Sequence, residues 1–193
     1  MIIFDNFKDC MDFLPKTLAE GIECIGFIVG ERTEVHYGLA NDADLEYCEA
    51  HGIPCYNLRQ PGGTVVSAAG NISIGFLYNN HDRGGLVLSP ILSDLMRYLS
   101  KRDLSATVNK NDLLVDGYKV AAGSARNFGE KHDWTYEVFY ISINQDLETI
   151  KNVCKKPMVK VPKGLSEYGI TTEEMVEWCS NWLKEHLDID VLP

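Results

Sequence analysis

Residues Asn111–Arg126, NDLLVDGYKVAAGSAR, contain the strongest structural signal in the chain. An Asp-Gly pair between two apolar runs is the firmest short-range indication of a two-residue β-hairpin turn. Asp116 and Gly117 form that pair here. The sequence therefore predicts two antiparallel strands that are joined at these two residues.

The two-residue turn also fixes the pairing register of the two strands. Val115 then faces Tyr118, and Leu114 faces Lys119. Asp112 precedes Leu114 by two positions, so it points to the same face as Lys119 at a diagonal distance of about 7–8 Å. One interpretation is an ordinary solvated ion pair. The other is a lysine that meets a ligand carboxylate or phosphate, with the aspartate nearby for a magnesium ion.

A second segment, Arg59–Asn71 (RQPGGTVVSAAGN), places an arginine before a glycine pair and ends in Gly-Asn. Glycine lets a backbone approach a ligand and leaves N–H groups open to phosphate or carboxylate oxygens, and arginine supplies a two-pronged donor. The same pattern also occurs as a turn without any ligand. By itself, this segment indicates only that an anion can be held here.

Length and composition bound the class of protein. The chain has 193 residues, of which 45% are hydrophobic and 24% charged. These values predict one α/β or α+β domain over residues 1–193. Lys and Arg total 18 against 28 Asp and Glu, which gives a net charge of −10. Without a basic cluster to follow a phosphate backbone, nucleic acid is not expected as a partner.

The amino terminus argues against export and membrane insertion. After Met1–Phe4 the sequence introduces Asp5, Lys8, Asp9 and Asp12. These charges leave no room for the apolar core of a signal peptide or for a membrane span. We therefore expect a cytoplasmic protein with no membrane partner.

Neither the cysteines nor the histidines form a recognisable metal or disulfide pattern. The cysteines are Cys10, Cys24, Cys48, Cys55, Cys154 and Cys179. The histidines are His36, His51, His81, His132 and His186. We expect reduced thiols, mostly buried, and histidines that serve as surface or core residues, without a disulfide or a structural metal.

Two helices near the amino end are less clearly delimited. Apolar periodicity over residues 4–20 predicts a helix that is interrupted or restarted at Pro15. Asn41 or Asp42 can cap a second helix that runs to His51.

Taken together, these features resemble the biotin/lipoate protein ligase and transferase family, and lipoate–protein ligases most of all. The segments at 59–71 and 111–126 look like the family's glycine-rich loop and its Asn-Asp hairpin followed by lysine. YISINQDL (140–147) and GITTEEMVEWCSNWL (169–183) resemble a strand and the terminal helix of lipoate ligases. The resemblance spans nearly the whole chain. It implies an α+β fold with a single mixed or antiparallel β-sheet and packed helices, like the class II synthetase-like catalytic domain of that family.

The resemblance also implies an activity. In that family a carboxylic acid such as lipoate, octanoate or biotin is joined to AMP, with ATP and Mg²⁺ as cofactors, and the acyl group then passes to a lysine of an acceptor protein. Lys119 corresponds to the lysine that contacts the acid's carboxylate and the α-phosphate. The remaining positions that match the substrate and adenylate site are Arg59, Gly62, Gly63, Thr64, Asn71, Asn111 and Asp112, with Asp112 also the candidate magnesium ligand. We expect Arg59 and the glycine pair to lie beside Lys119 in one pocket.

The sequence departs from the family at several points. Gln60-Pro61-Gly62-Gly63 replaces the usual Ser-Gly-Gly-Gly, and proline cannot donate a backbone N–H to a ligand. Ser67-Ala68 replaces the usual His-Asp. The accessory carboxyl-terminal domain of long lipoate ligases is not expected, because the sequence stops just after the terminal helix.

Two alternatives to an active ligase remain, and the loss of the His-Asp pair favours the first of them. One is a catalytically degenerate member of the family that binds a ligand or regulates another protein. The other is a thiol-dependent octanoyltransferase of the same fold, which needs a reactive cysteine in the pocket. Neither of the two chemical segments contains a cysteine.

Overall fold

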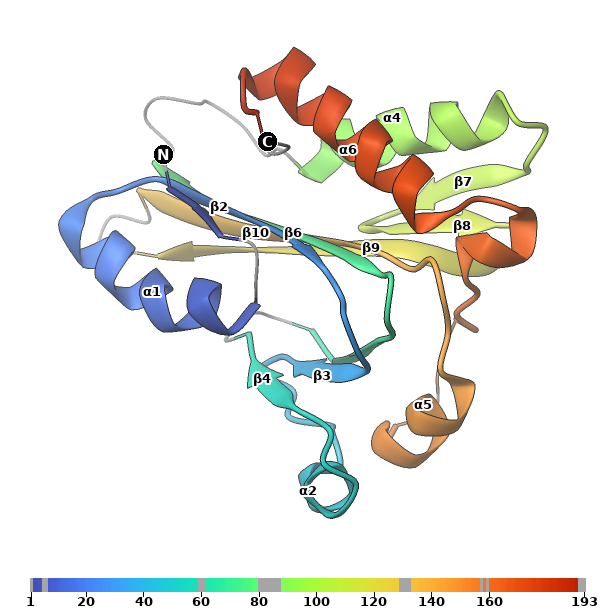
Figure 1. Cartoon of the computed structure of the whole chain (residues 1–193), viewed down its shortest axis with the longest axis horizontal. Helices are drawn as coiled ribbons and strands as arrows, with labels where there is room; N and C mark the ends of the chain where they lie inside the picture. Colours follow the sequence, from blue (N-terminus) through green and yellow to red (C-terminus); the bar gives the residue numbers. More distant parts are fainter. Residues whose placement is uncertain are drawn as a thin grey trace.

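The computed structural model describes residues 2–4, 7–58, 62–79, 88–128, 133–156, 158 and 160–190. It has an α+β architecture in which a large, mixed and mainly antiparallel β-sheet carries other elements on both faces (Figure 1). Within the described residues, none of the helices is long and apolar enough to cross a membrane.

The large sheet has seven strands in the order β1-β2-β6-β10-β9-β8-β7. Only β1 and β2 pair in parallel, and the other neighbours are antiparallel. The strands are β1 (Ile2–Phe4), β2 (Cys24–Val29), β6 (Ile72–Asn79), β7 (Ala106–Asn109), β8 (Asp112–Val115), β9 (Tyr118–Phe128) and β10 (Trp134–Ile141). Every residue of β6 from Ile72 to Tyr78 is buried, because both faces of the sheet are covered there.

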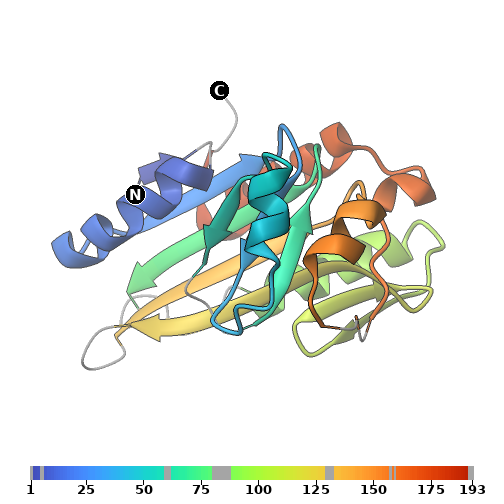
Figure 2. The ribbon, with the colours of Figure 1, turned by 90° about the horizontal axis from the view of Figure 1, so that it is seen from below.

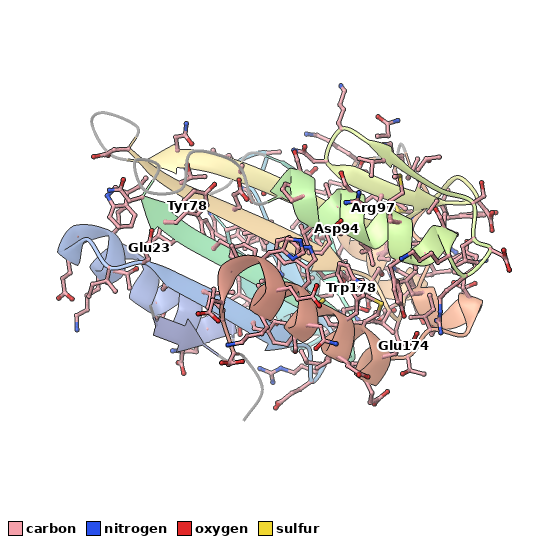
Figure 3. The ribbon with its side chains drawn as sticks, turned by 90° about the horizontal axis from the view of Figure 1, so that it is seen from above. Glu23, Tyr78, Asp94, Arg97, Glu174 and Trp178 are labelled. Carbon is pink, nitrogen blue, oxygen red and sulfur yellow. The ribbon has the colours of Figure 1, made fainter. Side chains whose placement is uncertain are left out.

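Helices α4 (Leu88–Ser100) and α6 (Thr172–Leu187) cover one face of the sheet and lie side by side (Figures 1 and 3). Their apolar sides form the main core with β6, β9 and β10. Polar contacts join the two helices at the surface. The Trp182 indole donates to Asp94 at 2.8 Å, and Tyr98 donates its hydroxyl to Glu174. A 3₁₀ turn, η1 (Leu165–Tyr168), precedes α6.

The opposite face carries α1 and a second, three-stranded sheet with the order β4-β3-β5 (Figure 2). Its strands are β3 (Glu34–Tyr37), β4 (Cys55–Asn57) and β5 (Thr64–Ser67). Helices α2 (Leu45–Ala50) and α5 (Leu147–Val153) pack on the outer side of this small sheet through a separate apolar cluster. The inner side of the small sheet is therefore left to face the large sheet.

Two expectations about helices are wrong. Helix α1 (Phe7–Glu20) runs through Pro15 without a break. Proline removes one N–H from the helical ladder, but the turns on either side keep their own hydrogen bonds. The residue that caps α2 is Asp44, whose carboxylate accepts from the Tyr47 N–H at 3.0 Å. Asp42 is consequently free of the capping role.

The hairpin is confirmed. Asp116 and Gly117 both have positive φ, at 52° and 83°, as a two-residue turn of this kind requires. Val115 pairs with Tyr118 and Leu114 with Lys119, as expected.

A β-bulge then shifts the register, so that Leu113 pairs with Ala121 and Asp112 with Ala122. The extra residue in the bulge is Val120. Beyond this point every residue of β9 faces the side opposite to the one that a regular hairpin would give it. Ala122 thereby comes to the same face as Lys119.

Candidate functional site

Three neighbouring cavities lie where the inner side of the small sheet meets the large sheet, and Lys119 lines all three. The glycine-side cavity, about 200 Å³, lies under Gly62 and Gly63. The loop-side cavity, about 100 Å³, lies beside Met158, Lys160 and Pro162. The mouth, about 390 Å³, is the third cavity and is lined by polar and charged side chains. Lys119 thus stands where the three spaces meet.

The floor of the glycine-side cavity is a row of residues that crosses the large sheet. Ser73 pairs with Tyr140, Tyr140 with Ala122, and Ala122 with Asp112. The small sheet supplies the roof through His36 and other residues. Mostly apolar walls with a charged pair at one end suit an acid whose carboxylate lies at Lys119 and whose tail extends across the sheet.

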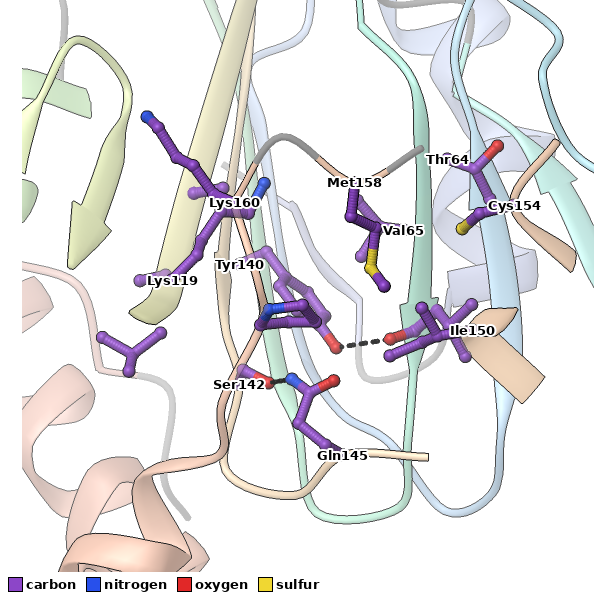
Figure 4. A pocket seen from close by; sticks show the side chains of 15 residues that line it. Thr64, Val65, Lys119, Tyr140, Ser142, Gln145, Ile150, Cys154, Met158 and Lys160 are labelled. Carbon is purple, nitrogen blue, oxygen red and sulfur yellow. Dashed lines mark hydrogen bonds between the residues drawn. The ribbon is translucent and has the colours of Figure 1, made fainter. Parts of the chain in front are cut away.

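The loop-side cavity lies on the other side of β5. Apolar groups from Val65, Ile150 and Met158 line it, and Lys119 and Lys160 stand together at one edge (Figure 4). A small polar group, in which Gln145 donates to the Ser142 hydroxyl, lies at its lower end in this view. This cavity can hold a second, separate moiety close to Lys119.

Tyr140 separates the two cavities and ties the two sheets together. Its hydroxyl donates to the Val66 carbonyl at 3.1 Å, which is the dashed line at Tyr140 in Figure 4. The same hydroxyl accepts from the Asn71 carboxamide at 2.6 Å. Burial raises the pKa of Tyr140 to about 12, although hydrogen bonds with Ser67 and Asn71 oppose the shift. The phenol therefore remains neutral and acts as a fixed spacer between the cavities.

Lys119, Asp112 and Lys160 form one charged cluster. The Asp112 carboxylate contacts the Lys119 ammonium at 3.4 Å through Oδ1 and the Lys160 ammonium at 2.6 Å through Oδ2. All three side chains are partly exposed, at 33%, 25% and 27%. The expectation that Asp112 and Lys119 project from the same face is confirmed by this contact. Lys160 is a member of the cluster that sequence reasoning missed.

The mouth holds a second pair of opposite charges. Asp42 accepts from the Thr64 hydroxyl at 2.7 Å and lies 4.0 Å from the Lys156 ammonium. The same carboxylate lies against Gly63, where a β-carbon would be only 3.0 Å from its Oδ2 atom. A side chain at position 63 would therefore require the Asp42 carboxylate to shift by a few tenths of an ångström.

Of the other residues that match the family's substrate and adenylate site, only some line the cavities. Gly62, Gly63 and Thr64 line cavities together with Lys119. Asn71 is 1% exposed and lines none of the three cavities, and its carboxamide oxygen accepts from the N–H groups of Ile143 and Asn144 at 2.7 and 2.8 Å. Asn111 is exposed, and its carbonyl accepts from Gly123 at 2.8 Å. Arg59, Gln60 and Pro61 lie outside the described residues.

Cys154 is a further residue that the sequence did not point to. It follows α5 and lines both the loop-side cavity and the mouth. In Figure 4 it lies across the cavity from Lys119 and Lys160. Burial raises the pKa of the Cys154 thiol and the charge of Asp42 adds to this effect, whereas Lys119 opposes it. No residue-type pattern could have revealed Cys154, because its segment reaches the site only through folding.

His36 is buried at 4% exposure and forms part of the roof of the glycine-side cavity. Its Nε2 atom lies 3.5 Å from the Glu34 carboxylate, and its ring meets Tyr56 edge-on at 5.8 Å between centroids. A core location was one of the two expectations for this histidine. Its place in the cavity wall was not expected.

Among the described residues, no three His, Cys, Asp or Glu side chains gather in a way that could hold a metal by themselves. Magnesium in proteins is instead often held by one or two carboxylates together with substrate phosphates. Asp112 and Asp42 both line the mouth, so the oxygen donors there fit that arrangement.

The large, mainly antiparallel sheet, with two helices on one face and a small sheet over the other, is the fold of the lipoate ligase catalytic domain. The profile of the lipoyl protein ligase A/B catalytic domain matches residues 26–191, and the chain belongs to this family. No curated protein matches the sequence.

Several solved structures share the fold of this chain. A putative lipoate protein ligase from T. acidophilum with bound lipoic acid is similar over 98% of this chain and 86% of its own, with a TM-score of 0.70 and 13% identity. A lipoate-protein ligase A bound with ATP is similar over 88% and 74%, with a TM-score of 0.66 and 15% identity. LipL1 of P. falciparum in complex with lipoate is similar over 89% and 50%, with a TM-score of 0.65 and 15% identity. At these identities the likeness establishes the fold.

Proposed function

We propose that residues 1–193 form a single catalytic domain that activates a carboxylic acid, lipoate, octanoate or a related acid, as acyl-AMP and transfers it to a lysine of an acceptor protein. The observation that carries the proposal is the position of Lys119, which lines both the glycine-side and the loop-side cavity. An adenylating enzyme must hold an acid and a nucleotide with their reacting groups together. Structures of related ligases with lipoic acid and with ATP support these two substrates.

In the first step, a carboxylate oxygen of the acid attacks the α-phosphorus of ATP, and the bond to pyrophosphate breaks. Negative charge grows on the phosphoryl oxygens during this step. The Lys119 ammonium can contact both the carboxylate and the α-phosphate, because it borders both cavities. Asp112, 3.4 Å from this ammonium, keeps it in place before the substrates bind.

In the second step, the amine of the acceptor lysine attacks the acyl carbonyl, an amide forms, AMP leaves, and the amine loses its proton. The mouth is the open side through which a lysine chain can enter. A magnesium ion at the mouth would neutralise phosphate charge. Asp112 and Asp42 are the two residues of this chain that would hold the magnesium ion.

In this proposal the acid binds in the glycine-side cavity. Its walls combine the backbone of Gly62 and Gly63 with apolar side chains such as Leu58 and Val138. An acid of this kind gains most of its affinity from burial of its hydrocarbon chain. Because Lys119 lies at one end of the cavity, the carboxylate end of the acid faces the nucleotide.

The test is magnesium-dependent exchange of labelled pyrophosphate into ATP over a panel of lipoate, octanoate, biotin and shorter acids. We expect exchange that depends on one or a few of these acids. If no acid supports exchange, calorimetry with ATP and each acid follows. Binding without exchange would reject the ligase and favour the degenerate, ligand-binding alternative.

A thiol-dependent acyltransferase is the second candidate, because Cys154 lines a cavity with Lys119. In that reaction the thiolate attacks an acyl thioester, the donor thiol leaves, and an acceptor lysine then displaces Cys154. The raised pKa of Cys154 disfavours the thiolate that this step needs. The structure therefore favours the ATP-dependent reaction.

The two reactions differ in their need for Cys154. We expect Cys154→Ser to retain acid-dependent pyrophosphate exchange, and we expect octanoyl thioesters to leave no hydroxylamine-sensitive acyl group on the wild type in mass spectrometry. An acylated wild type, together with an unreactive Cys154→Ser variant, would establish the transferase instead.

A further inference from the structure

We propose that Lys160 is a second phosphate-binding lysine of this site, one that acts on the nucleotide and not on the acid. The inference deepens the proposed function and rests on it. Lys160 stands on the segment between α5 and η1, far from both chemical segments in the sequence.

Backbone hydrogen bonds hold Val161 and Lys163 against β9. The Lys119 N–H donates to the Val161 carbonyl at 2.9 Å, and the Lys163 N–H donates to the Lys119 carbonyl at 3.0 Å. Pro162 forms a parallel bridge with Lys119 between these two bonds. Lys160 is thereby tied to the same stretch of strand that carries Lys119.

The side chains then meet at Asp112. Its two carboxylate oxygens bind different ammonium groups, Lys119 at 3.4 Å and Lys160 at 2.6 Å. One carboxylate cannot neutralise two lysines, so the cluster keeps an excess of positive charge. Asp112 also holds both lysines in position without a ligand, which lowers the conformational cost when an anion arrives.

The mouth as a whole also carries a net positive charge. Its charged lining consists of Asp42, Asp112, Lys119, Lys156 and Lys160, which gives a net charge of +1 in a chain whose overall charge is −10. A local positive site on an acidic protein favours a multiply charged anion over a neutral ligand. The triphosphate of ATP is such an anion.

The cavities separate the roles of the two lysines. Lys119 lines all three, whereas Lys160 lines the loop-side cavity and the mouth but does not line the glycine-side cavity. A residue that contacts only the nucleotide lowers the KM for ATP and leaves the KM for the acid unchanged. A salt bridge that only stabilised the fold would change neither constant selectively.

Lys163 offers a matched control on the same segment. Its ammonium lies over the ring of Tyr168 at 4.2 Å and pairs with Glu167 at 3.8 Å, so it is engaged away from the cluster. Lys163→Gln removes the same charge from the same stretch of chain. It therefore reproduces any general effect of charge loss or of a disturbed segment.

The experiment measures pyrophosphate exchange for wild type, Lys160→Gln, Lys160→Arg and Lys163→Gln, with ATP and the acid varied in turn and the melting temperature recorded. Loss of a charge-assisted contact predicts a rise of about tenfold in the KM for ATP with Lys160→Gln. We expect the KM for the acid to stay within about twofold. Lys160→Arg should recover most of the loss, and Lys163→Gln should behave as wild type.

An unchanged KM for ATP with Lys160→Gln, an equal rise for Lys163→Gln, or a matching rise in the KM for the acid would each overturn the proposal. If wild type shows no exchange with any acid, that result contradicts the proposed function but does not yet test Lys160. Calorimetry with ATP alone then tests the role of Lys160. Binding that Lys160→Gln weakens about tenfold would support its role. Equal binding, or no binding by wild type, would overturn it.

Discussion

The Lys119 ammonium lies 3.4 Å from the Asp112 carboxylate, across a hairpin whose regular pairing is broken by one extra residue. The tight turn aligns Lys119 with Leu114, and the bulge then turns Ala122 to the face on which Lys119 and Asp112 lie. A small residue therefore lies directly beside the charged pair, which leaves space for a ligand over the strand. The turn thus places the charged side chains on this face, and the bulge places a small side chain beside them.

Replacement of Lys119 by alanine should separate catalysis from stability. Loss of one preorganised donor to developing charge typically lowers the rate by about 10²–10³-fold. A partly exposed ion pair contributes only about 0–1 kcal/mol to stability. We expect Lys119→Ala to lose pyrophosphate exchange while its melting temperature hardly changes. Exchange equal to wild type would exclude a catalytic role for this lysine.

The turn itself can be tested at Gly117. Its φ is +83°, and an added β-carbon would meet nothing within 4 Å, so backbone strain is the only cost of a side chain there. We expect Gly117→Ala to lower the free energy of unfolding by about 1–2 kcal/mol in urea titrations. Asp116→Gly at the neighbouring position should be close to neutral, since φ is also positive there. Equal effects of the two substitutions would contradict this account.

The two asparagines that resemble ligand-binding residues should behave differently. The buried Asn71 carboxamide binds two N–H groups of the β10 to α5 connection and the Tyr140 hydroxyl. Asn71→Ala leaves these groups without their partner, so we expect the free energy of unfolding to fall by about 1–3 kcal/mol. Asn111→Ala, at an exposed position, should stay within about 0.5 kcal/mol of wild type in the same urea titration. A stable Asn71→Ala protein would show that this network is dispensable.

The contact between α4 and α6 predicts a dependence of stability on pH. Burial by itself would raise the pKa of Asp94, but the hydrogen bond from Trp182 and the pairing with Arg97 outweigh it and hold the pKa below the ordinary value of 3.8. Figure 3 shows Asp94 and Arg97 together on α4. A depressed pKa stabilises the fold above the ordinary value, and this contribution is lost as the pH falls through the folded-state pKa.

Urea unfolding of wild type and Asp94→Asn between about pH 6 and pH 2.5 measures this contribution. We expect the advantage of wild type to be constant near neutral pH and to shrink below about pH 4. A difference that grows on acidification would have the wrong sign and would reject this assignment.

Some features of the site follow from local sequence. The turn at Asp116 and Gly117 depends on two adjacent residues that tolerate positive φ, so the hairpin and the shared face of Lys119 and Asp112 were predictable. The α+β fold and the family were predictable as well, because the glycine-rich loop and the hairpin keep their order and spacing along the chain. The position of Arg59 stays a prediction, since it lies outside the described residues.

Other features depend on contacts between distant segments, for which sequence has no local rule. Lys160 reaches Lys119 because residues 161–163 pair with β9, and Cys154 reaches the cavity because α5 packs on the small sheet. Asp42 lies at the mouth, where its carboxylate accepts from Thr64 of the small sheet. The sequence alone determined which residues could carry charge and where the chain must turn. Beyond the pair of Lys119 and Asp112 on one hairpin, only the tertiary structure decided which of those charges meet, because contacts between segments that are distant in the sequence set their distances.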